Sequence, residues 1–391
     1  MEGKKVLIIA HKPPYPKVDG GCIAIAQLLE AYLSIGISVH FIAMETAKHP
    51  GKNNLQHPNL HYKTVRVNTS VNLIGALKNL FSKSSYFLSR FAQKSIEDEL
   101  IKTLDKHTFE TVIFESLFTC SYIDIVRKNS KAKLVYRSHN IEHKIWETQN
   151  SSETNTIRKG YLNIQIRRLK KEELSLWNAV DMIASIAKTD SIKMAQKSST
   201  EIKNIGLYCN KTYLNASDES TKIDFFHIGA MDWKPNLTAI IWLLNNVWKE
   251  FRSNNTKAEL HLAGRKMPSE LIFNQDKGVH NHKEVSDSLN FMSSHKVMLV
   301  PLFSGSGIRV KIIEGLALGK CIITTNIGAA GIAITPNKNI LIANTKEEFI
   351  AKMEFCINKP DKVKEIGEKA RQFARENFSE ENIHQQLKDL L

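Results

Sequence analysis

The chain has 391 residues, of which 42% are hydrophobic and 24% are charged, and an excess of Lys and Arg gives it a formal net charge of +14. This length is too great for one compact core and predicts two domains, and the ordinary composition excludes collagen-like, low-complexity and short-repeat architectures. The basic surplus favours a polyanionic partner, which at this point can be nucleic acid, an anionic membrane or a phosphorylated ligand.

The cysteines and the apolar runs predict a cytoplasmic protein. The five cysteines are scattered without a C-x-x-C pair, which argues against a zinc site or a disulfide framework, and we expect them to be small buried residues. The first apolar run, Val6 to Ala10, is too short for a secretory signal. No run of about 18 apolar residues predicts a membrane-spanning helix.

Strands and helices alternate in the first half of the chain. The continuous apolar run 5–11 is typical of a strand that is buried on both faces of a parallel sheet, and the helical periodicity of 22–36 ends at Gly36. A long helical region is predicted over 141–178. Because the strands are separated by helices, the pattern predicts right-handed βαβ units. The further strands are predicted at 37–44, 110–116, 132–139 and, followed by a turn, 179–190.

A polar, turn-rich segment over 203–222 precedes a second alternation of strands and helices. We therefore predict an α/β protein with two Rossmann-like, doubly wound parallel-sheet domains that face a central cleft. The second set of strands is predicted at 223–230, 258–264, 296–302, 321–325 and 340–344. The predicted parts are an N-terminal domain at 1–205, a linker at 206–222, a C-terminal domain at 223–374, and a C-terminal helix at 375–391 that packs back on the N-terminal domain.

A Ser/Gly loop in the second half places two cations at the start of a helix. Ser304 to Gly307 follow a predicted strand, Arg309 and Lys311 come next, and Glu314 follows one turn later. Helix starts usually favour acidic residues, so cations beside flexible glycines indicate an anion such as phosphate. The alternative is a solvated loop with two surface cations.

These residues resemble the GT-B glycosyltransferases of family 4, also described as glycosyl transferases group 1, and the resemblance extends over essentially the whole chain. Its most specific part is "PLFSGSGIRVKIIEGLALGKCIITTNIGAAGI" at 301–332, in which Cys321 replaces the usual proline. Further matches are 226–236 with 260–268, "VYRSHNIEH" at 135–143, and a Gly-Gly turn after the first strand.

The resemblance implies a transfer of a sugar from a nucleotide diphosphate sugar (UDP-, GDP- or ADP-linked) to a hydroxyl of a glycan or lipid-linked acceptor. The transfer would retain the anomeric configuration, need no metal or other cofactor, and serve cell-surface polysaccharide or glycan synthesis. The N-terminal domain would bind the acceptor and the C-terminal domain the donor. The residues implied to be catalytic are His139, Lys311 and Glu314, and those implied to bind the donor are Gly20, Gly21, Gly229, Lys234, Arg265, His280, Ser306, Gly307, Ile308, Arg309, Lys311 and Glu314.

Two positions depart from the family pattern. Ser306 stands where the first glutamate of a two-glutamate motif is expected, and Ala230 stands where an arginine is expected. We expect Arg309 and Lys311 to compensate, with help from Lys234 or Arg265. The departures also support an alternative, a non-catalytic nucleotide-sugar or glycan-binding protein on the same fold. A dinucleotide-dependent oxidoreductase is disfavoured, because no G-x-G-x-x-G follows the first strand.

Several residues near the predicted site also have purely structural interpretations. His139 is either functional or a histidine satisfied at a strand end, and we favour function. Asp19 is predicted to cap the helix that begins near Gly21 rather than to bind the acceptor. His11 is interpreted as a core or loop residue, and Glu142 with His143 as a solvated helix start.

Two basic segments raise the question of polyanionic partners. The segment 71–94 mixes apolar residues with lysines and an arginine, so it is either a basic amphipathic helix on an anionic membrane or an ordinary helix on the sheet. Such contact would make the protein peripheral on the inner face of the plasma membrane. The segment 158–173 is predicted to be an ion-paired, solvated helix, because no nucleic-acid-binding fold surrounds it. No nucleic-acid partner is therefore expected.

Overall fold

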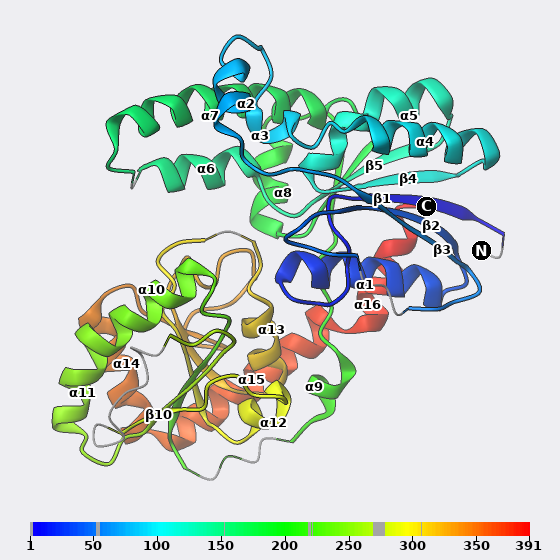
Figure 1. The fold of residues 1–391 in the computed structure, drawn as a ribbon. Coiled ribbons are helices and arrows are strands. Elements are labelled where there is room, and N and C mark those ends of the chain that lie inside the picture. The colour runs from blue at the N-terminus through cyan, green and yellow to red at the C-terminus, as the bar shows by residue number, and fades with distance from the viewer. Residues whose placement is uncertain are drawn as a thin grey trace. The chain divides into compact units, whose positions relative to one another are not determined.

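The computed structural model describes residues 3–51, 55–151, 153–217, 220, 222–268, 278–305 and 307–391. The chain divides into two compact units, of which unit 1 is Met1–Leu207 with Ile383–Leu391 and unit 2 is Tyr208–Asn382. Each unit is a parallel sheet with helices on both faces, which confirms the predicted α/β class with two doubly wound sheets (Figure 1).

The sheet of unit 1 has the order β3-β2-β1-β4-β5-β6-β7, and all of its strands are parallel. The predicted apolar strand is β1, which is central and buried, so both of its faces meet other side chains. The strands are β1 (Lys5–Ala10), β2 (Ser38–Glu45), β3 (Leu60–Arg66), β4 (Thr111–Glu115), β5 (Lys133–Ser138), β6 (Met182–Ser185) and β7 (Glu201–Asn204).

Helices cover both faces of this sheet, with α1 on one face and α4 and α5 on the other (Figure 1). The Asp19 carboxylate accepts a hydrogen bond of 2.8 Å from the backbone N–H of Cys22, which confirms the predicted helix cap. The helices are α1 (Gly20–Ser34), α2 (Leu73–Asn79), α3 (Tyr86–Ser89), α4 (Lys94–Lys106), a 3₁₀ turn (Leu117–Tyr122), α5 (Ile123–Asn129), α6 (Glu142–Ser151), α7 (Thr156–Trp177) and α8 (Lys188–Ala195).

The sheet of unit 2 has the order β10-β9-β8-β11-β12-β13, again all parallel. Its side chains alternate between two helical layers: Phe225 packs on Trp248 and Phe251, whereas Phe226 packs on Phe291. The strands are β8 (Phe225–Ile228), β9 (Leu260–Ala263), β10 (Val279–Asn281), β11 (Val297–Val300), β12 (Cys321–Thr324) and β13 (Leu341–Ile342).

The helices of unit 2 form those two layers, with α10, α11 and α14 on one side of the sheet and α12 and α13 on the other (Figure 1). The C-terminal segment from Ile383 belongs to unit 1, where the Tyr32 hydroxyl donates to the Leu387 carbonyl. The helices are α9 (Lys211–Asn215), α10 (Lys234–Trp242), a π-helical turn (Leu243–Trp248), α11 (Lys249–Asn254), α12 (Ser288–Ser293), α13 (Val310–Ala317), α14 (Lys346–Asn358) and α15 (Pro360–Phe378), and α16 (Glu380–Lys388) follows.

Some elements differ from those that the sequence predicts. The sequence analysis misses the strands β3, β7 and β10, because they are partly exposed and lack a continuous apolar run. The segment 71–94 is two short helices rather than one, since the chain turns after α2 and Ser85 caps α3. The cysteines are all free and buried, as predicted. Within the described ranges, no helix combines the length and the apolar character that crossing a bilayer requires.

Candidate functional site

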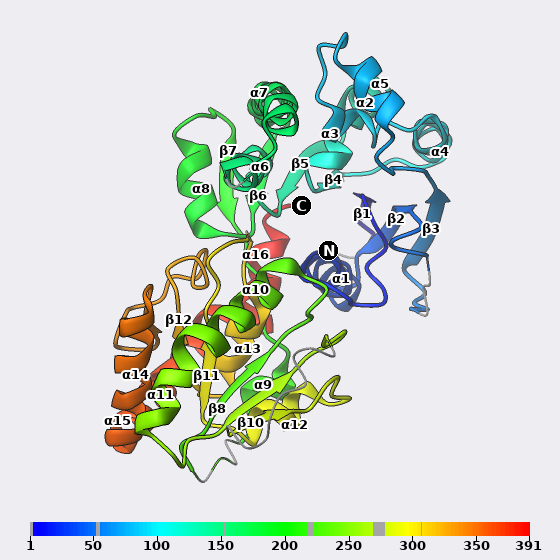
Figure 2. The same ribbon diagram turned by 60° about the vertical axis from the view of Figure 1, so that its left-hand side comes forward.

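The strand order of unit 2 reverses between β8 and β11, which are adjacent in the sheet but far apart in sequence. In doubly wound sheets, ligands bind beyond the carboxyl ends of the strands at such a reversal. The chain leaves β8 through Gly229 to Trp233 and leaves β11 through the Ser/Gly loop (Figure 2). These two loops, with the first turns of α10 and α13, form the candidate donor site.

The Ser/Gly loop depends on glycine at two positions. Gly305 and Gly307 have φ angles of 104° and 77°, in the left-handed region that favours glycine. A Cβ on Gly305 would also lie 2.8 Å from the Trp233 indole. The backbone of this loop is therefore free of side chains at two places next to the helix start. Ser306, which the sequence analysis assigns to the donor, lies outside the described residues.

Arg309 is a built part of the site rather than a surface cation. It is only 5% exposed, its guanidinium lies 5.4 Å from the centre of the Trp233 ring, and its Nη1 donates to the Gly307 carbonyl at 2.5 Å. Burial lowers the pKa of Arg309 to about 10, so the group stays charged at neutral pH. The alternative of two solvated surface cations is thus wrong for this residue.

Lys311 projects from the first turn of α13 toward the end of β8. Its Nζ donates to the Asn236 side-chain oxygen at 2.8 Å and lies 3.3 Å from Nε2 of His227. The other ring nitrogen of His227 lies 2.7 Å from the Leu299 carbonyl and must donate to it, which leaves Nε2 as an acceptor. A Cβ on Gly229 would lie 2.5 Å from Nζ, so this glycine makes room for the ammonium.

Lys311 and Glu314 have opposite pKa shifts that meet near neutrality. Burial, with a smaller effect of Arg309, lowers the pKa of Lys311 to about 7, although Glu314 opposes this. Burial also raises the pKa of Glu314 to about 7, against the pull of Lys311. Perturbed groups in such a location are typical of functional sites. In the described part of the chain, no neighbour donates a hydrogen bond to the Glu314 carboxylate.

The other residues assigned to the donor lie in less enclosed places. Lys234 is exposed at the first position of α10, and Ile308 is half-buried in the loop. Arg265 Nη2 pairs with Asp232 at 3.1 Å. His280 lies on β10, stacked on His261 with ring centres 4.6 Å apart. Arg265 and His280 therefore contact residues other than Lys311 and Glu314. The donor-binding roles of all four residues stay predictions.

Unit 1 reverses its strand order between β1 and β4, and a buried carboxylate lies there. Glu115, the last residue of β4, is fully buried. Its Oε1 pairs with Arg137 Nη1 at 3.1 Å, and its Oε2 lies 2.5 Å from Nε2 of His139. The pKa of Glu115 is lowered, because Arg137 and His139 outweigh the burial that would raise it. His139 is therefore held in one orientation at the carboxyl end of the sheet.

His11 and Ser116 complete this cluster. Nδ1 of His11 lies 2.8 Å from the Ser116 hydroxyl, and burial, followed by the charge of Lys12, lowers its pKa well below the usual range. Ser116 has a φ of 84°, a strained conformation for a residue with a side chain, with a typical cost of about 1–3 kcal/mol. Such strain is found mostly where function requires a fixed geometry.

Lys12, in the loop between β1 and α1, lies beside the start of α1. Its Nζ bonds Asp19 at 2.6 Å, and a Cβ on Gly21 would lie 2.7 Å from it, whereas a Cβ on Gly20 would meet open space. Burial would raise the pKa of Asp19, but His49 and Lys12 hold it far below the usual range. A pocket of about 970 Å³ opens here, and His11, Lys12, Asp19, His49, Arg66, Asn68, Arg90 and Phe91 are among its lining residues.

The interpretation of Glu142 and His143 as a solvated helix start is wrong. Both side chains are buried, and Glu173 of α7 accepts hydrogen bonds from both backbone N–H groups and lies 2.7 Å from Nδ1 of His143. Burial and the nearby Glu173 raise the pKa of Glu142 to about 8. The residues fix the start of α6 behind His139 instead of facing solvent.

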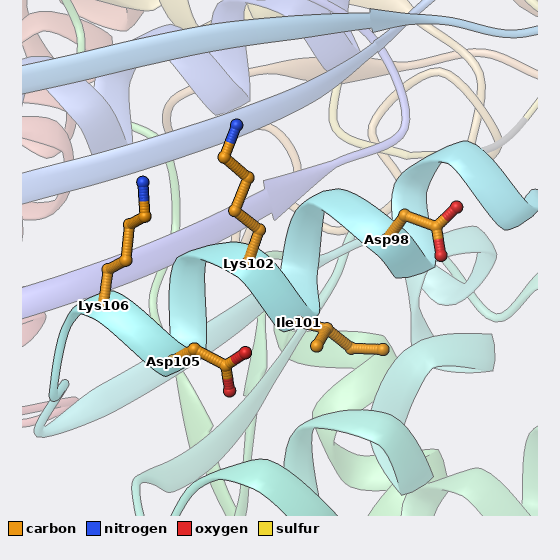
Figure 3. A pocket seen from close by; sticks show the side chains of 5 residues that line it. All are labelled: Asp98, Ile101, Lys102, Asp105 and Lys106. Carbon is orange, nitrogen blue, oxygen red and sulfur yellow. The ribbon is translucent and has the colours of Figure 1, made fainter.

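A second hollow, of about 290 Å³, lies along α4 (Figure 3). This hollow is lined only by residues of α4, which are Asp98, Ile101, Lys102, Asp105 and Lys106. The two lysines project from one side of the helix and the two aspartates from another (Figure 3). Charges of both signs at helical spacing are typical of a solvated helix face. We therefore assign no site to it.

Several residues of these clusters are absent from the sequence-based assignment, among them Glu115, His227, Asn236 and Lys12. Glu115 and His227 are buried polar residues within apolar strands. Because a buried polar group needs a hydrogen-bonding partner, their place in the sequence already indicates a polar cluster. Asn236 and Lys12 carry no such signal, since asparagine near a helix start and lysine in a loop are common. Their roles depend on tertiary contacts alone.

Comparisons with known proteins agree with this geometry. Residues 222–359 match the family model described as "Glycosyl transferases group 1". The "Uncharacterized 44.6 kDa protein in cps region" of Klebsiella pneumoniae is 21% identical over 406 residues, which cover 97% of each chain.

Solved structures match the whole chain. Sucrose-phosphate synthase from Thermosynechococcus elongatus superposes with a TM-score of 0.71 at 14% identity and covers 99% of this chain and 98% of its own. Anabaena Alr3699/HepE superposes with a TM-score of 0.67 at 12% identity, with 98% of both chains covered. The donor-site unit thus matches the glycosyl transferases group 1 model over residues 222–359, and the chain has the fold of the GT-B glycosyltransferases.

Proposed function

We propose that this protein transfers a sugar from a nucleotide diphosphate sugar to a hydroxyl of a glycan or lipid-linked acceptor, with retention of the anomeric configuration and without an obligatory metal. The observation that carries the proposal is the pair of cations, buried Arg309 and half-buried Lys311, beside two glycines at the strand reversal of unit 2. A diphosphate is the anion that such a site suits best, because it offers two charged groups to two cations and to backbone N–H groups.

The chemistry follows from where charge develops. When the sugar–phosphate bond breaks, negative charge grows on the departing diphosphate, and fixed positive groups stabilise it. Arg309 is charged throughout the neutral range, and a bound diphosphate would keep Lys311 protonated. Glu314 lies one turn beyond Lys311 on α13, where a carboxylate accepts hydrogen bonds from ribose hydroxyls. The resemblance to the family implies the same role for Glu314.

We assign the acceptor to unit 1. His139 is fixed by Glu115, and the pocket at the start of α1 carries Lys12, His49 and Arg66 beside apolar Phe91. Sugars favour such mixtures of hydrogen-bonding groups and aromatic faces. His139 would contact the acceptor hydroxyl or the reacting sugar, while Gly20 and Gly21 leave the backbone at the helix start open.

The comparisons support the substrate classes. The Anabaena protein was solved in complex with UDP and, separately, with UDP-glucose. The Klebsiella relative is encoded in a cps region, which favours a role in capsule or other surface polysaccharide synthesis. The proposal does not specify the base or the sugar of the donor.

An exposed apolar surface on unit 1 supports contact with an anionic membrane. Five apolar side chains on and around α2 are more than 60% exposed, and Phe81 is 96% exposed; Val71, Leu73, Ile74 and Leu77 are the others. Lys78 and Lys83 lie exposed among them, so the surface joins apolar and positive groups, as membrane-binding helices do. Arg168 of α7 donates to the carbonyls of Asn79 and Leu80, which fastens α2 to the unit.

A donor screen tests the central proposal. UDP-, GDP- and ADP-sugars are each incubated with the protein, and binding is followed by thermal shift and turnover by release of the nucleoside diphosphate. We expect one class to stabilise the protein and to be slowly hydrolysed, and Glu314→Ala to abolish the release. If no donor binds, or if Glu314→Ala behaves as the wild type, the site assignment is wrong.

Vesicle binding tests the membrane surface. Sedimentation with phosphatidylglycerol vesicles at low salt should capture the wild type, and the double variant Leu77→Ser, Phe81→Ser should lose capture while its donor release is unchanged. Lys249→Ser on α11 of unit 2 is the matched control. Failure of the wild type to bind these vesicles would contradict membrane contact but not the transfer reaction.

A further inference from the structure

Unit 2 contains a cluster of histidines that the transfer reaction does not use. His261 on β9 and His280 on β10 are direct neighbours in the parallel register, so their side chains share a face of the sheet. His282 follows two residues after His280 on the same face, and His295 precedes β11. The ring centres of His280, His282 and His295 lie 4.6, 5.3 and 4.1 Å from that of His261.

Hydrogen bonding fixes which nitrogen of His261 is available. Its Nδ1 lies 3.0 Å from Nε2 of His282, so one of the two nitrogens carries the proton between them. When His261 donates from Nδ1, its Nε2 bears the lone pair. Nδ1 of His295 makes a separate bond of 2.6 Å with Asp224.

Two of the ring nitrogens are buried without a hydrogen bond to the protein. In the part of the chain that the structure describes, Nε2 of His261 and Nε2 of His280 have no partner. Buried polar atoms nearly always have one, and each exception requires an explanation. The carboxylate of Glu259 lies near both, at 3.9 Å from His261 Nε2 and 3.7 Å from His280 Nε2. Asp224 Oδ2 lies 3.8 Å from His261 Nε2, but it already bonds His295.

These separations are too long for hydrogen bonds but close to those of ligands around a metal ion. Zinc–nitrogen and zinc–oxygen bonds of about 2.0–2.2 Å in a tetrahedral site place neighbouring ligand atoms about 3.3–3.5 Å apart. One ligand atom from each of Glu259, His261 and His280 lies within 4.8 Å of the others. The two carboxylate–imidazole separations therefore exceed the tetrahedral value by only a few tenths of an ångström.

The surroundings supply the remaining requirements. The hydrogen bond from His261 Nδ1 to His282 is the support that metal-bound histidines usually have behind them. Glu259 and His280 are each about one third exposed, so an ion can enter from solvent and water can complete its coordination. Glu259 also pairs with Lys222, which is mostly exposed, so this lysine can move away at little cost.

We propose that Glu259, His261 and His280 bind a divalent transition-metal ion of the zinc class, which links β9 to the three-residue edge strand β10. Two imidazoles and one carboxylate suit such ions. The site is distinct from the donor site, because His261 and His280 lie on β9 and β10 and Glu259 directly precedes β9, whereas Lys311 and Glu314 lie on α13. His280 then has its function here rather than in donor binding.

The test uses the full-length chain without a histidine tag, after treatment with EDTA. Cobalt(II) is the probe, because tetrahedral cobalt absorbs visible light, and zinc is then titrated to displace it. We expect one equivalent of cobalt to bind with a visible spectrum, zinc to displace it, and zinc to raise the Tm. Removal of a ligand by His280→Asn or Glu259→Gln should weaken cobalt binding by roughly 100-fold or more.

Two variants serve as controls. His295→Asn keeps a side chain that can bond Asp224, and His107→Asn alters a histidine of unit 1, so both should bind cobalt as the wild type does. The Tm of each apo variant shows that it is folded. The proposal is overturned if the wild type gives no cobalt spectrum, or if binding is lost in His295→Asn but kept in His280→Asn.

Discussion

The two sheets reverse their strand order at equivalent places, between β1 and β4 in unit 1 and between β8 and β11 in unit 2, but they carry opposite chemistry there. In unit 1 a buried carboxylate, Glu115, is fully compensated by Arg137 and His139. In unit 2 two cations lie among glycines, an indole and neutral polar groups, and within the described residues no ion pair joins Glu314 to Lys311.

This difference separates two ways of building a functional site. The cluster of unit 1 is complete without a ligand, so it serves to hold His139 in place. The cluster of unit 2 holds a lysine whose pKa is lowered to about 7, so a bound anion would favour its charged form. Removal of a charge should therefore affect stability in unit 1 and function in unit 2.

The largest effect is expected for Glu115→Gln. The variant leaves Arg137 buried without its partner and His139 without its support, so the free energy of unfolding in urea should fall by roughly 3–5 kcal/mol. Glu201→Gln, at an exposed position, is the control and should change it little. A loss below about 1 kcal/mol would show that the carboxylate is not compensated as the structure indicates.

Lys311→Met should have the opposite profile. Loss of one preorganised positive group should lower turnover by about 10²–10³-fold. The Tm should stay equal or rise, because an enclosed ammonium is costly to desolvate. Nucleoside diphosphate release and thermal unfolding measure the two effects, with exposed Lys249→Met as the control. If Lys311→Met lowered the Tm but left turnover unchanged, the charge in unit 2 would serve stability rather than function, which would contradict the comparison between the units.

His139→Ala tests whether the cluster of unit 1 serves the reaction. We expect kcat to fall by roughly 10²-fold, the lower range for a positioned acid–base group. Donor affinity, measured by titration calorimetry, should not change. If kcat is also unchanged, His139 is only a satisfied strand-end histidine, and the site of unit 1 must lie elsewhere in its pocket.

The pH dependence of nucleoside diphosphate binding is the smallest expected effect. Lys311 has a lowered pKa of about 7 in the free protein, and a diphosphate favours its charged form, so binding takes up a proton above this pH. Affinity should be constant below pH 7 and fall by up to about tenfold per unit above it. Titration calorimetry in two buffers measures the uptake, and Lys311→Arg should remove it, because arginine stays charged. Equal pH profiles in both proteins would show that another group titrates.

The sequence predicts the fold better than it predicts the clusters. Long apolar runs such as 5–11 and the strand–loop–helix pattern at 296–317 follow local rules, and the strands and the helix are confirmed. The polar partners of Lys311 come from β8 and α10, more than 70 residues away, and no local pattern links them. Glu142 and His143 were misjudged for the same reason, since their partner Glu173 lies on another helix.

The C-terminal return of the chain also affects how the protein is made. Leu387 and Leu390 are buried in unit 1, and the Thr111 hydroxyl donates to the Leu390 carbonyl. On a ribosome, these residues emerge about 175 residues after Leu207, a delay of roughly 9–35 s at ordinary rates of synthesis. Unit 1 must therefore wait, incompletely folded, while all of unit 2 is translated. We therefore expect chaperones to bind unit 1 of the nascent chain until the C-terminal segment has been translated, although unit 1 is synthesised first.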